Sequence, residues 1–443
     1  NSKIAGATGA TKYKTYNVNN TAIAGAVSGT RNYYYRRDPK LTISGLTASK
    51  TYDGNTNAAT SLSGGTVLGN IDGDTYSLAN LTRLSATYNT KDVGSRTLSA
   101  SYIAPTRTAS GYTVSGYDVN AYSQAGAGTI SKKTVSLSGA KTYDGNTALT
   151  IGEVTIATGV GTETLTFSGA TANDSHVSTT GKYIDAITLG NGSSGGLASN
   201  YALPTLNTAN AAVTISAKTL TPTLSNTGVT KVYDGITSSP TGFTPTYTYS
   251  GFVAGDTDAA LSNTAMVYNS SHVASANKIT VSGLSINSIT GSNSSLGSDY
   301  VLNATSKDVT ATITPATLTT SLTNTGVTKV YDGTANAPAG FTPTYNITGF
   351  VSGDTAGTIT NTGSVYDDAH VVNASKITVS GLAVGSITGN KGSQASDYAL
   401  DASSKEVTAA ITPKDLTPVI GSVNVSKTYD GSVDGTSALN YSY

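Results

Sequence analysis

The sequence contains no cysteine and no tryptophan, and only 12% of its 443 residues are charged. The absence of thiols excludes disulfide bridges, thiol nucleophiles and cysteine-ligated metals. The 26 basic and 26 acidic residues cancel, so the net charge indicates neither a nucleic-acid partner nor attraction to an anionic membrane. No apolar run approaches the roughly 18 residues of a membrane span, and we therefore expect no membrane insertion.

Residues that favour helices are scarce as well. Glutamate occurs only as Glu153, Glu163 and Glu406, whereas tyrosine occurs 27 times. Threonine, valine, isoleucine and tyrosine favour strands. The stretch "KITVSGLSI" at 278–286 alternates apolar and polar residues, and so does "AVTISAKTL" at 212–220. Alternation with a period of two residues is typical of strands, so the sequence predicts an all-β protein.

The tripeptide Tyr-Asp-Gly recurs along the chain, each time after a lysine and a β-branched residue, as in "KTYDG" at 50–54. Its tyrosines are separated by 91, 90, 98 and 98 residues. A period of this length is a whole small domain, not one turn of a solenoid. The motif residues are Tyr52, Asp53, Gly54, Tyr143, Asp144, Gly145, Tyr233, Asp234, Gly235, Tyr331, Asp332, Gly333, Tyr429, Asp430 and Gly431.

Other landmarks recur in step with the motif. "GFVAGDT" at 251–257 returns as "GFVSGDT" at 349–355, and "SDYVL" at 298–302 returns as "SDYAL" at 396–400. These landmarks predict four full repeats and two partial ones, which we expect to be a segment of a longer array. The predicted divisions are the tail of an upstream repeat at 1–38, repeat 1 at 39–131, repeat 2 at 132–216, repeat 3 at 217–314, repeat 4 at 315–412 and the start of a further repeat at 413–443.

Each repeat of roughly 90 residues has the size of a small domain. The pattern fits an immunoglobulin-like sandwich or a β-grasp-like domain with one short helix, and it leaves both open. The candidate for that helix is "GDTDAALSN" at 255–263. The last strand of one repeat leads through Pro or Ala into the next first strand, as in "TITPATL" at 312–318. Junctions without a flexible linker predict an elongated rod of tandem β domains.

The Tyr-Asp-Gly motif is interpreted as a structural corner at the end of a strand. Glycine accepts a positive φ, and the aspartate carboxylate accepts hydrogen bonds from the backbone N–H groups that follow it. The tyrosine supplies a large ring whose hydroxyl is satisfied at the edge of a small core. The alternative is a cation at each aspartate, but one carboxylate per motif is too few for a calcium site with six to eight oxygen ligands.

No catalytic, cofactor or metal site is predicted. His176, His272 and His370 occupy one equivalent place in successive repeats, and Asp92 takes that place in repeat 1. Equivalent positions lie a domain length apart, so these histidines cannot share one metal or one catalytic triad. The stretch "GSSGG" at 192–196 lacks the strand–turn–helix setting of a serine nucleophile. We expect a protein that is not an enzyme and uses no cofactor.

The order of landmarks resembles that of the YDG/MBG-type repeats of large bacterial surface proteins, found in filamentous-haemagglutinin-like adhesins exported by two-partner secretion. The likeness rests on Tyr-Asp-Gly, then "GD" about 20 residues later, a [DH]-V segment, [ND]-Y-x-L and "TITPATL". In repeat 1, "VNAYSQ" at 119–124 stands in place of [ND]-Y-x-L. The resemblance implies a non-enzymatic structural stalk, secreted or at the bacterial cell surface, that carries a binding region outward.

The partners implied are therefore neighbouring repeats of the same chain. Regions outside this segment are expected to contact polysaccharide or the surface of a host or another cell. The alternative is that the repeats themselves bind glycans or a matrix polysaccharide.

Overall fold

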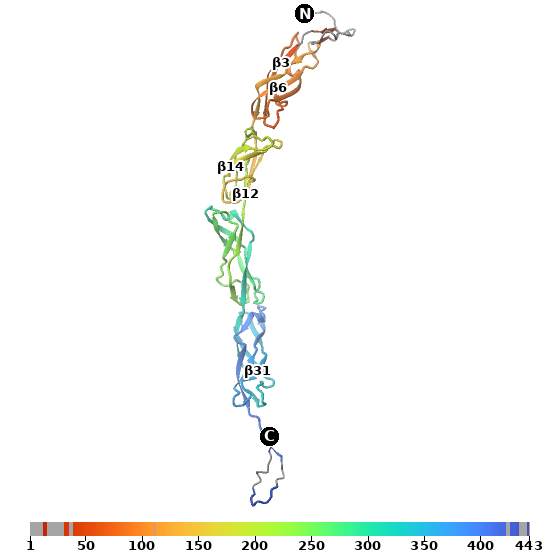
Figure 1. The fold of residues 1–443 in the computed structure, drawn as a ribbon. Helices are drawn as coiled ribbons and strands as arrows, with labels where there is room; N and C mark the ends of the chain where they lie inside the picture. Colours follow the sequence, from red (N-terminus) through yellow and green to blue (C-terminus); the bar gives the residue numbers. More distant parts are fainter. Residues whose placement is uncertain are drawn as a thin grey trace. The chain divides into compact units, whose positions relative to one another are not determined.

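The computed structural model describes residues 12–15, 31–34, 39–109, 111–421, 426–433 and 441–442 (Figure 1). Within these ranges the regular structure consists of strands and short 3-10 turns, with no α-helix. The prediction of an all-β protein is confirmed. The chain forms two compact units. The first comprises Asn1–Lys218, Val253–Asp256 and Gly291–Tyr300, and the second comprises Thr219–Phe252, Thr257–Thr290 and Val301–Tyr443.

Repeat 4 lies wholly in the second unit and shows the arrangement best. Its sheets run in the orders β29-β27-β34, β28-β35-β32-β31 and β30-β33. Its elements are β27 (Ala316–Leu322), β28 (Val327–Val330), β29 (Tyr345–Thr348), β30 (Asp354–Thr360), β31 (Gly363–Tyr366), β32 (Lys376–Ser380), β33 (Ala383–Gly389), η4 (Ala395–Asp397), β34 (Tyr398–Leu400) and β35 (Ser404–Thr412).

Repeat 3 has the same element order, but its residues are divided between the two units. Its sheet β19-β26-β23-β22 lies in the second unit. Its elements are β18 (Lys218–Leu224), β19 (Val229–Val232), β20 (Tyr247–Ser250), β21 (Asp256–Ser262), β22 (Ala265–Tyr268), β23 (Lys278–Ser282), β24 (Ser285–Gly291), η3 (Gly297–Asp299), β25 (Tyr300–Leu302) and β26 (Ser306–Thr314).

Repeats 1 and 2 lie in the first unit. Repeat 2 holds β11 (Lys133–Thr134), β12 (Ser136–Thr142), β13 (Val154–Ala157), β14 (Leu165–Ala172), β15 (Ile184–Asn191), η2 (Ala198–Asn200), β16 (Tyr201–Ala202) and β17 (Val213–Ser216). Repeat 1 holds β3 (Lys40–Thr51), β4 (Leu62–Leu68), η1 (Leu78–Asn80), β5 (Thr82–Tyr88), β6 (Gly94–Ile103), β7 (Arg107–Ala109), β8 (Tyr112–Ser115), β9 (Asp118–Val119) and β10 (Tyr122–Ser131).

Of the two partial repeats, little is described. In residues 1–38 the structure gives β1 (Lys12–Thr15) and β2 (Arg31–Tyr34), and β1 pairs in parallel with β8 of repeat 1. In residues 413–443 it gives β36 (Val419–Ile420) paired with β37 (Tyr441–Ser442). The remaining residues of both predicted partial repeats lie outside the described ranges.

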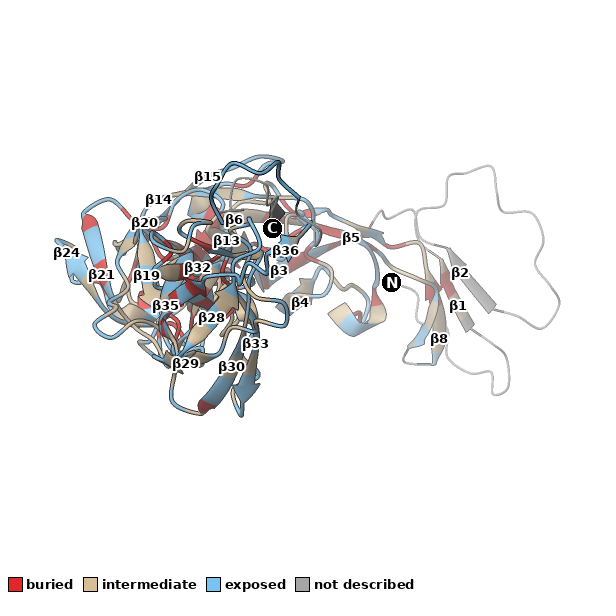
Figure 2. Cartoon of the chain, turned by 90° about the horizontal axis from the view of Figure 1, so that it is seen from below, coloured by how far each residue is buried: buried red, intermediate tan, exposed pale blue. Residues whose placement is uncertain are grey.

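The alternating strands bury one face, as the sequence predicts. Ile279 and Val281 on β23 are fully buried, and Ile377 and Val379 occupy the same places on β32. Buried and less buried positions alternate along both strands, and Figure 2 colours the chain by burial. Each fully buried aliphatic side chain contributes roughly 1.5–3 kcal/mol to folding. The core of each repeat thus consists of many small, regularly placed apolar residues.

The last strand of every repeat pairs in parallel with a strand near the start of that repeat, which is the first strand in repeat 1 and the second in repeats 2, 3 and 4. In repeat 4, β28 pairs with β35 from Val327↔Ala409 to Val330↔Thr412. The same four-residue register joins β3 to β10, β12 to β17 and β19 to β26. The strand along which the chain leaves each repeat therefore runs beside a strand near its entry, in the same direction.

Two sequence interpretations are corrected by the structure. The predicted short helix at 255–263 is instead the strand β21, and the helical turn of repeat 3 is η3, a 3-10 turn directly before Tyr300. The segment "VNAYSQ" is not the counterpart of [ND]-Y-x-L in repeat 1. Tyr117 fills that place, since the strand that follows it, β9, pairs in parallel with β3 as β34 pairs with β27.

Candidate functional site: the junctions between repeats

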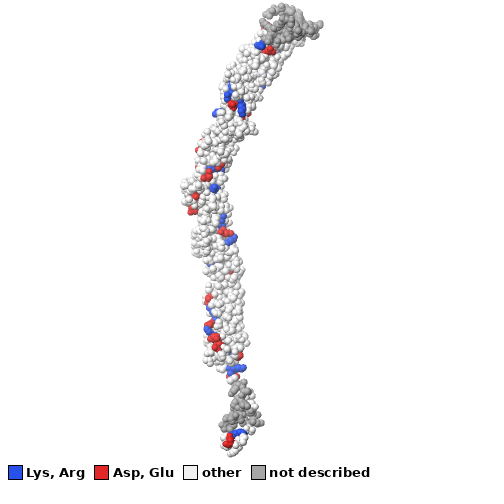
Figure 3. Space-filling model, viewed as in Figure 1, with Lys and Arg blue, Asp and Glu red and all other residues white. Residues whose placement is uncertain are grey.

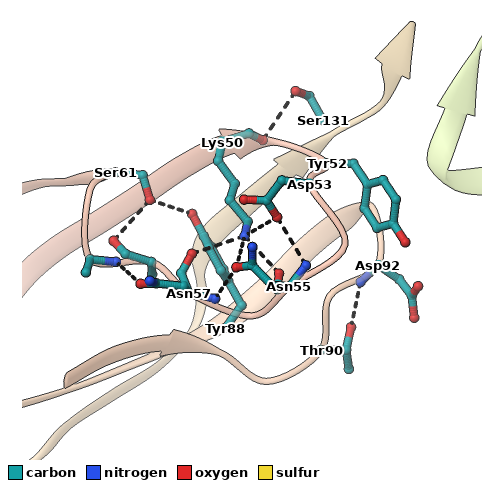
Figure 4. A network of polar contacts seen from close by, with 12 residues as sticks. Lys50, Tyr52, Asp53, Asn55, Asn57, Ser61, Tyr88, Thr90, Asp92 and Ser131 are labelled. Atoms are coloured by element: carbon teal, nitrogen blue, oxygen red, sulfur yellow. Dashed lines mark hydrogen bonds and ion pairs between the residues drawn. The ribbon is translucent and has the colours of Figure 1, made fainter. Parts of the chain in front are cut away.

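The Tyr-Asp-Gly motif forms the expected corner. In repeat 1, Lys50 Nζ donates to Asp53 Oδ1 at 2.6 Å and to the carbonyl oxygen of Asn55 at 2.8 Å, and the N–H of Asn55 also donates to Asp53. Figure 4 shows Lys50 at the centre of this network, with the ring of Tyr52 directed away from it. The lysine before the motif is thus part of the corner, a role that the sequence alone did not assign.

The same corner recurs at every copy of the motif. The lysine–aspartate distances are 2.6 Å for Lys141–Asp144, 2.7 Å for Lys231–Asp234, 2.8 Å for Lys329–Asp332 and 2.8 Å for Lys427–Asp430. The motif glycines have φ between +76° and +86°, a conformation that only glycine adopts without strain. Glycine is therefore the residue that suits this place in each copy of the corner.

The motif tyrosine leaves this corner and enters the next repeat. In the first compact unit, the hydroxyl of Tyr143 lies 2.6 Å from Ser295 Oγ, and Ser295 donates to Asp256 Oδ2 at 2.6 Å. Because Ser295 has a single proton, the hydroxyl of Tyr143 is the donor to Ser295. Tyr300 also donates to Asp256 Oδ2, at 2.6 Å, and its ring packs edge-on against Tyr143 at 5.7 Å. We call this set junction 2.

Junction 3, in the second compact unit, repeats this geometry. Tyr233 lies 2.6 Å from Ser393 Oγ, while Ser393 and Tyr398 donate to Asp354 Oδ2 at 2.5 and 2.6 Å. The rings of Tyr233 and Tyr398 are again edge-on, at 5.5 Å. One apolar cluster contains Tyr233 from repeat 3 together with Leu318 and Tyr398 from repeat 4. The two repeats therefore share a continuous core at this point.

Junction 1 uses a different acid for the same purpose. The hydroxyls of Tyr52 and Tyr201 donate to Glu163 at 2.8 and 2.7 Å, and Lys91 Nζ donates to it at 2.6 Å. Tyr52 belongs to repeat 1, whereas Glu163 and Tyr201 belong to repeat 2. The longer glutamate accepts directly from Tyr52, so no serine intervenes. Sequence reasoning missed Glu163, although its rarity in this chain was a usable signal.

Glu163 of junction 1 and Tyr398 of junction 3 have shifted pKa values. Burial raises the pKa of Glu163, but hydrogen bonds from Lys91, Tyr201 and Tyr52 outweigh burial and hold the pKa below its ordinary value. Burial, followed by the hydrogen bond to Asp354, raises the pKa of Tyr398 to about 12. These shifts favour an ionised Glu163 and a protonated Tyr398, which is the state in which a tyrosine hydroxyl donates to an acid.

A second polar pair joins the repeats beside each tyrosine. His176 Nδ1 lies 2.8 Å from Asp299 Oδ2, and the N–H of Val177 donates to Asp299 Oδ1 at 2.7 Å. His272 and Val273 contact Asp397 at 2.8 Å in the same way. An ionised carboxylate only accepts, so the imidazole Nδ1 carries the proton. His176 and His272 thus bridge to the following repeat, each with its own partner.

At junction 1 both members of this pair are different. Asp92 stands in place of histidine, and Asn200 stands in place of aspartate, with Asn200 Nδ2 donating to Asp92 Oδ1 at 2.9 Å. Two carboxylates here would repel each other. The exit residue of one repeat and the receiving residue of the next are therefore matched to each other.

Repeat 4 provides an internal comparison, since the residues after 412 contain no further "GDT" or "SDY" segment. Tyr52, Tyr143 and Tyr233 are at most 3% exposed, whereas Tyr331 is 36% exposed. The His370 side chain is 72% exposed and contacts Asp368 of its own repeat, compared with 24% exposure for His176 and His272. The burial of these residues thus depends on the following repeat.

The junctions are groups of buried, hydrogen-bonded polar side chains, in which Asp354 Oδ1 has no hydrogen-bond partner among the described residues. In each junction the tyrosine hydroxyls donate to a carboxylate, directly or through a serine. In the described part of the chain, no three His, Asp or Glu side chains gather in a way suited to a metal ion. The described residues also include no helix of the length and hydropathy needed to cross a membrane.

Comparison with protein families gives one match. The model of the YDG domain family matches residues 35–126, 216–307 and 314–406, which together make up more than half of the chain. These ranges cover repeats 1, 3 and 4 and leave out repeat 2, in which Glu163 and Asn200 replace the usual junction residues. A comparison with curated proteins gives no match.

Proposed function

The chain belongs to the YDG domain family, and from this premise we propose that it is a non-enzymatic structural segment of a large bacterial surface or matrix adhesin of the filamentous-haemagglutinin-like, two-partner secretion type. In this role the repeats form a stalk that holds a binding region away from the cell. The protein is secreted or exposed on the cell surface, its direct partners are its own neighbouring repeats, and it requires no cofactor.

The observation that carries this proposal is the repeated tyrosine–acid junction. Each motif tyrosine of repeats 1–3 donates into a buried acid–tyrosine group of the following repeat, directly or through a serine. A second bridge lies beside each one. Two separate contacts restrict both bending and rotation at a junction, which suits a stiff spacer better than a flexible linker.

The surface is consistent with a spacer role. On the face shown in Figure 3, acidic and basic side chains stand next to each other in small groups, and most of the surface is uncharged. A surface without a strong field of one sign does not attract a charged ligand. The proposal therefore places ligand recognition outside this segment.

The alternative, in which the repeats themselves bind glycans, would need an exposed aromatic platform. The aromatic group of repeat 3 consists of Tyr247, Tyr249 and Phe252, whose rings pack against one another at 6.1 and 5.5 Å. These rings are half-buried, and the hydroxyl of Tyr249 donates to the carbonyl oxygen of Ala259. This packing is that of a small core, and it does not favour the glycan-binding alternative.

Small-angle scattering on the 443-residue chain tests the stalk. Strands of roughly 7–10 residues give a domain about 30–40 Å long, so four aligned repeats extend on the order of 120–160 Å. A rod of that length has a radius of gyration of about 35–46 Å, against about 22 Å for a compact chain of this size. A value near the compact one would contradict the stalk.

The location is tested separately. Antibodies against the chain are expected to label intact, unpermeabilised cells of the source bacterium. Labelling only after permeabilisation would contradict a surface role. Titration of the chain with glycans, followed by calorimetry, checks the alternative, and saturable heat would favour it.

A further inference from the structure

We infer that each repeat is a mechanical clamp, built so that tension along the chain loads in shear its last strand and the parallel strand near its start. This goes beyond a spacer role, because it concerns resistance to force within one repeat. The clamp is a property of the fold and can be tested whether or not the chain acts as a stalk.

The argument starts from the direction of these two strands. In a parallel pair, pulling the start of the first strand away from the end of the last strand makes the two strands slide along each other. All hydrogen bonds between them are then strained together. In repeat 4 these strands are β28 and β35, with four residue pairs in register.

Backbone contacts extend the ladder beyond the strands. The N–H of each motif tyrosine donates to the carbonyl oxygen of the last residue of the final strand, at 2.8–2.9 Å in all four full repeats. In repeat 4 this bond runs from Tyr331 to Thr412. Thr412 is followed at once by Pro413, which leads out of the repeat. The last contact of the ladder therefore lies at the point where tension leaves the repeat.

A side-chain contact reinforces that point. The hydroxyl of Thr412 donates to the carbonyl oxygen of Lys329, at 3.2 Å. Ser131, Ser216 and Thr314 make the equivalent bond to Lys50, Lys141 and Lys231, each at 3.3 Å. A hydroxyl residue thus ends every full repeat. Its side chain donates to the lysine before the motif, and its carbonyl group accepts from the motif tyrosine, two residues after that lysine.

The motif tyrosine therefore serves two contacts at once. Its N–H closes the clamp of its own repeat, and in repeats 1–3 its side-chain hydroxyl reaches the next repeat. Tension at the end of one repeat is thus carried by two routes. One is the backbone that leads into the next repeat, and the other is the side-chain contact of the motif tyrosine with that repeat. Sequence reasoning assigned the motif to a corner alone, because neither contact is local in sequence.

The direction of pulling provides the test. The chain has no cysteine, so two introduced cysteines are unique attachment points for optical tweezers. The variant Thr325→Cys with Lys414→Cys pulls the two ends of the β28–β35 pair in opposite directions along the strands. The variant Val330→Cys with Lys414→Cys pulls the neighbouring ends apart and opens the pair one contact at a time. All three positions are exposed.

At equal loading rate, we expect the unfolding force in the first geometry to be about four times that in the second, since four residue pairs share the load instead of one. Both variants release a similar length of chain, on the order of 300 Å, which identifies the event as repeat 4. Equal forces in the two geometries would overturn the clamp. Forced unfolding reports the unfolding rate, so equal equilibrium stabilities would not affect the comparison.

The same two pulling directions can be tested in repeat 3, in case a cysteine variant of repeat 4 does not fold. In repeat 3, Thr227→Cys and Val232→Cys, each combined with Thr317→Cys, reproduce the two directions at exposed positions. In the sliding geometry of repeat 4, Thr412→Val should lower the unfolding force, because it removes the hydroxyl contact and keeps the backbone ladder. Thr408→Val, at an exposed threonine of the same strand, is the matched control and should leave the force unchanged. If neither Thr412→Val nor Thr408→Val changes the unfolding force, the hydroxyl of Thr412 does not contribute to the clamp.

The outcomes separate this inference from the proposed function. A compact radius of gyration with a large force ratio would contradict the stalk and support the clamp. An extended radius with equal forces would support the stalk and overturn the clamp.

Discussion

The hydroxyl of Tyr143 lies 2.6 Å from Oγ of Ser295, 152 residues further along the chain. The first residue belongs to a corner of repeat 2, and the second belongs to a loop of repeat 3. Ser295 in turn donates a hydrogen bond to Asp256, which is 8% exposed. A motif that looks local in sequence thus ends in the buried polar group of the neighbouring repeat.

We expect Tyr233→Phe to destabilise repeats 3 and 4 by about 1 kcal/mol, because Ser393 loses the donor to its half-buried hydroxyl. Tyr331→Phe is the matched control, since its ring is 36% exposed, and it should change stability by less than about 0.5 kcal/mol. Urea unfolding of the full chain measures both. Equal effects of the two substitutions would contradict the role of Tyr233 in junction 3.

We expect the motif glycines to differ in their tolerance of alanine. At Gly333, φ is +80° and an added Cβ meets no atom within 4 Å, so Gly333→Ala should cost only the backbone strain of about 1–2 kcal/mol. At Gly54, φ is also +80°, but the Cβ would lie 2.6 Å from Val160 Cγ1 of the next repeat. Gly54→Ala should therefore cost roughly 1–3 kcal/mol more. Equal losses in thermal unfolding would show that the junction does not close on Gly54.

We expect acid to weaken the corner of repeat 4. Hydrogen bonds from Lys329 and Thr334 lower the pKa of Asp332 to about 2. Because the folded pKa lies below the unfolded value of about 3.9, the contribution is present above pH 4 and is lost as the pH falls through about 2. Asp332→Asn should melt at a lower temperature near pH 6 and show a smaller change between pH 4 and 2. Since Asp332 is exposed, high salt should reduce the difference.

We expect alkali to weaken junction 3. The pKa of Tyr398 is raised to about 12, chiefly by burial and then by its bond to Asp354. A tyrosine in the unfolded chain ionises near pH 10, so the stabilisation is complete below pH 10 and is lost as the pH rises through about 12. Tyr398→Phe should be less stable near pH 8 and should depend less on pH above 10. Parallel pH profiles for the parent and the variant would count against a buried, protonated Tyr398.

We expect repeat 3 to fold as a fragment of residues 217–314 but to be less stable than in a fragment of residues 132–314. Its segments Val253–Asp256 and Gly291–Tyr300 belong to the same compact unit as repeat 2, and without it Ser295 and Asp299 lose Tyr143 and His176. Circular dichroism during urea unfolding compares the two fragments. Identical midpoints for repeat 3 would show that junction 2 contributes nothing to its stability.

Much of the local structure could be predicted from the sequence. The alternation at Ile279 and Val281 defines a strand by itself, because side chains of a strand point to opposite faces in turn. The glycine of each corner is equally local, since a positive φ depends on the residue and its immediate neighbours. The misassigned helix at 255–263 marks the limit of such reasoning. Its residues do not exclude a helix, and pairing within the fold makes them the strand β21.

By itself the sequence determined the strands, the corners and the spacing of the repeats, because these depend on neighbouring residues and recur with a visible period. Only the tertiary structure decided which residue of the next repeat accepts the hydrogen bond from each motif tyrosine. Tyr52 meets Glu163, 111 residues away, and Tyr233 meets Ser393, 160 residues away. Such pairs are set by how the end faces of two repeats pack, and no local preference records that packing. Glu163 and Asp256 thus hold equivalent tyrosines although their sequence surroundings differ, because a buried hydroxyl requires an acceptor at one point in space, not at one place in a motif.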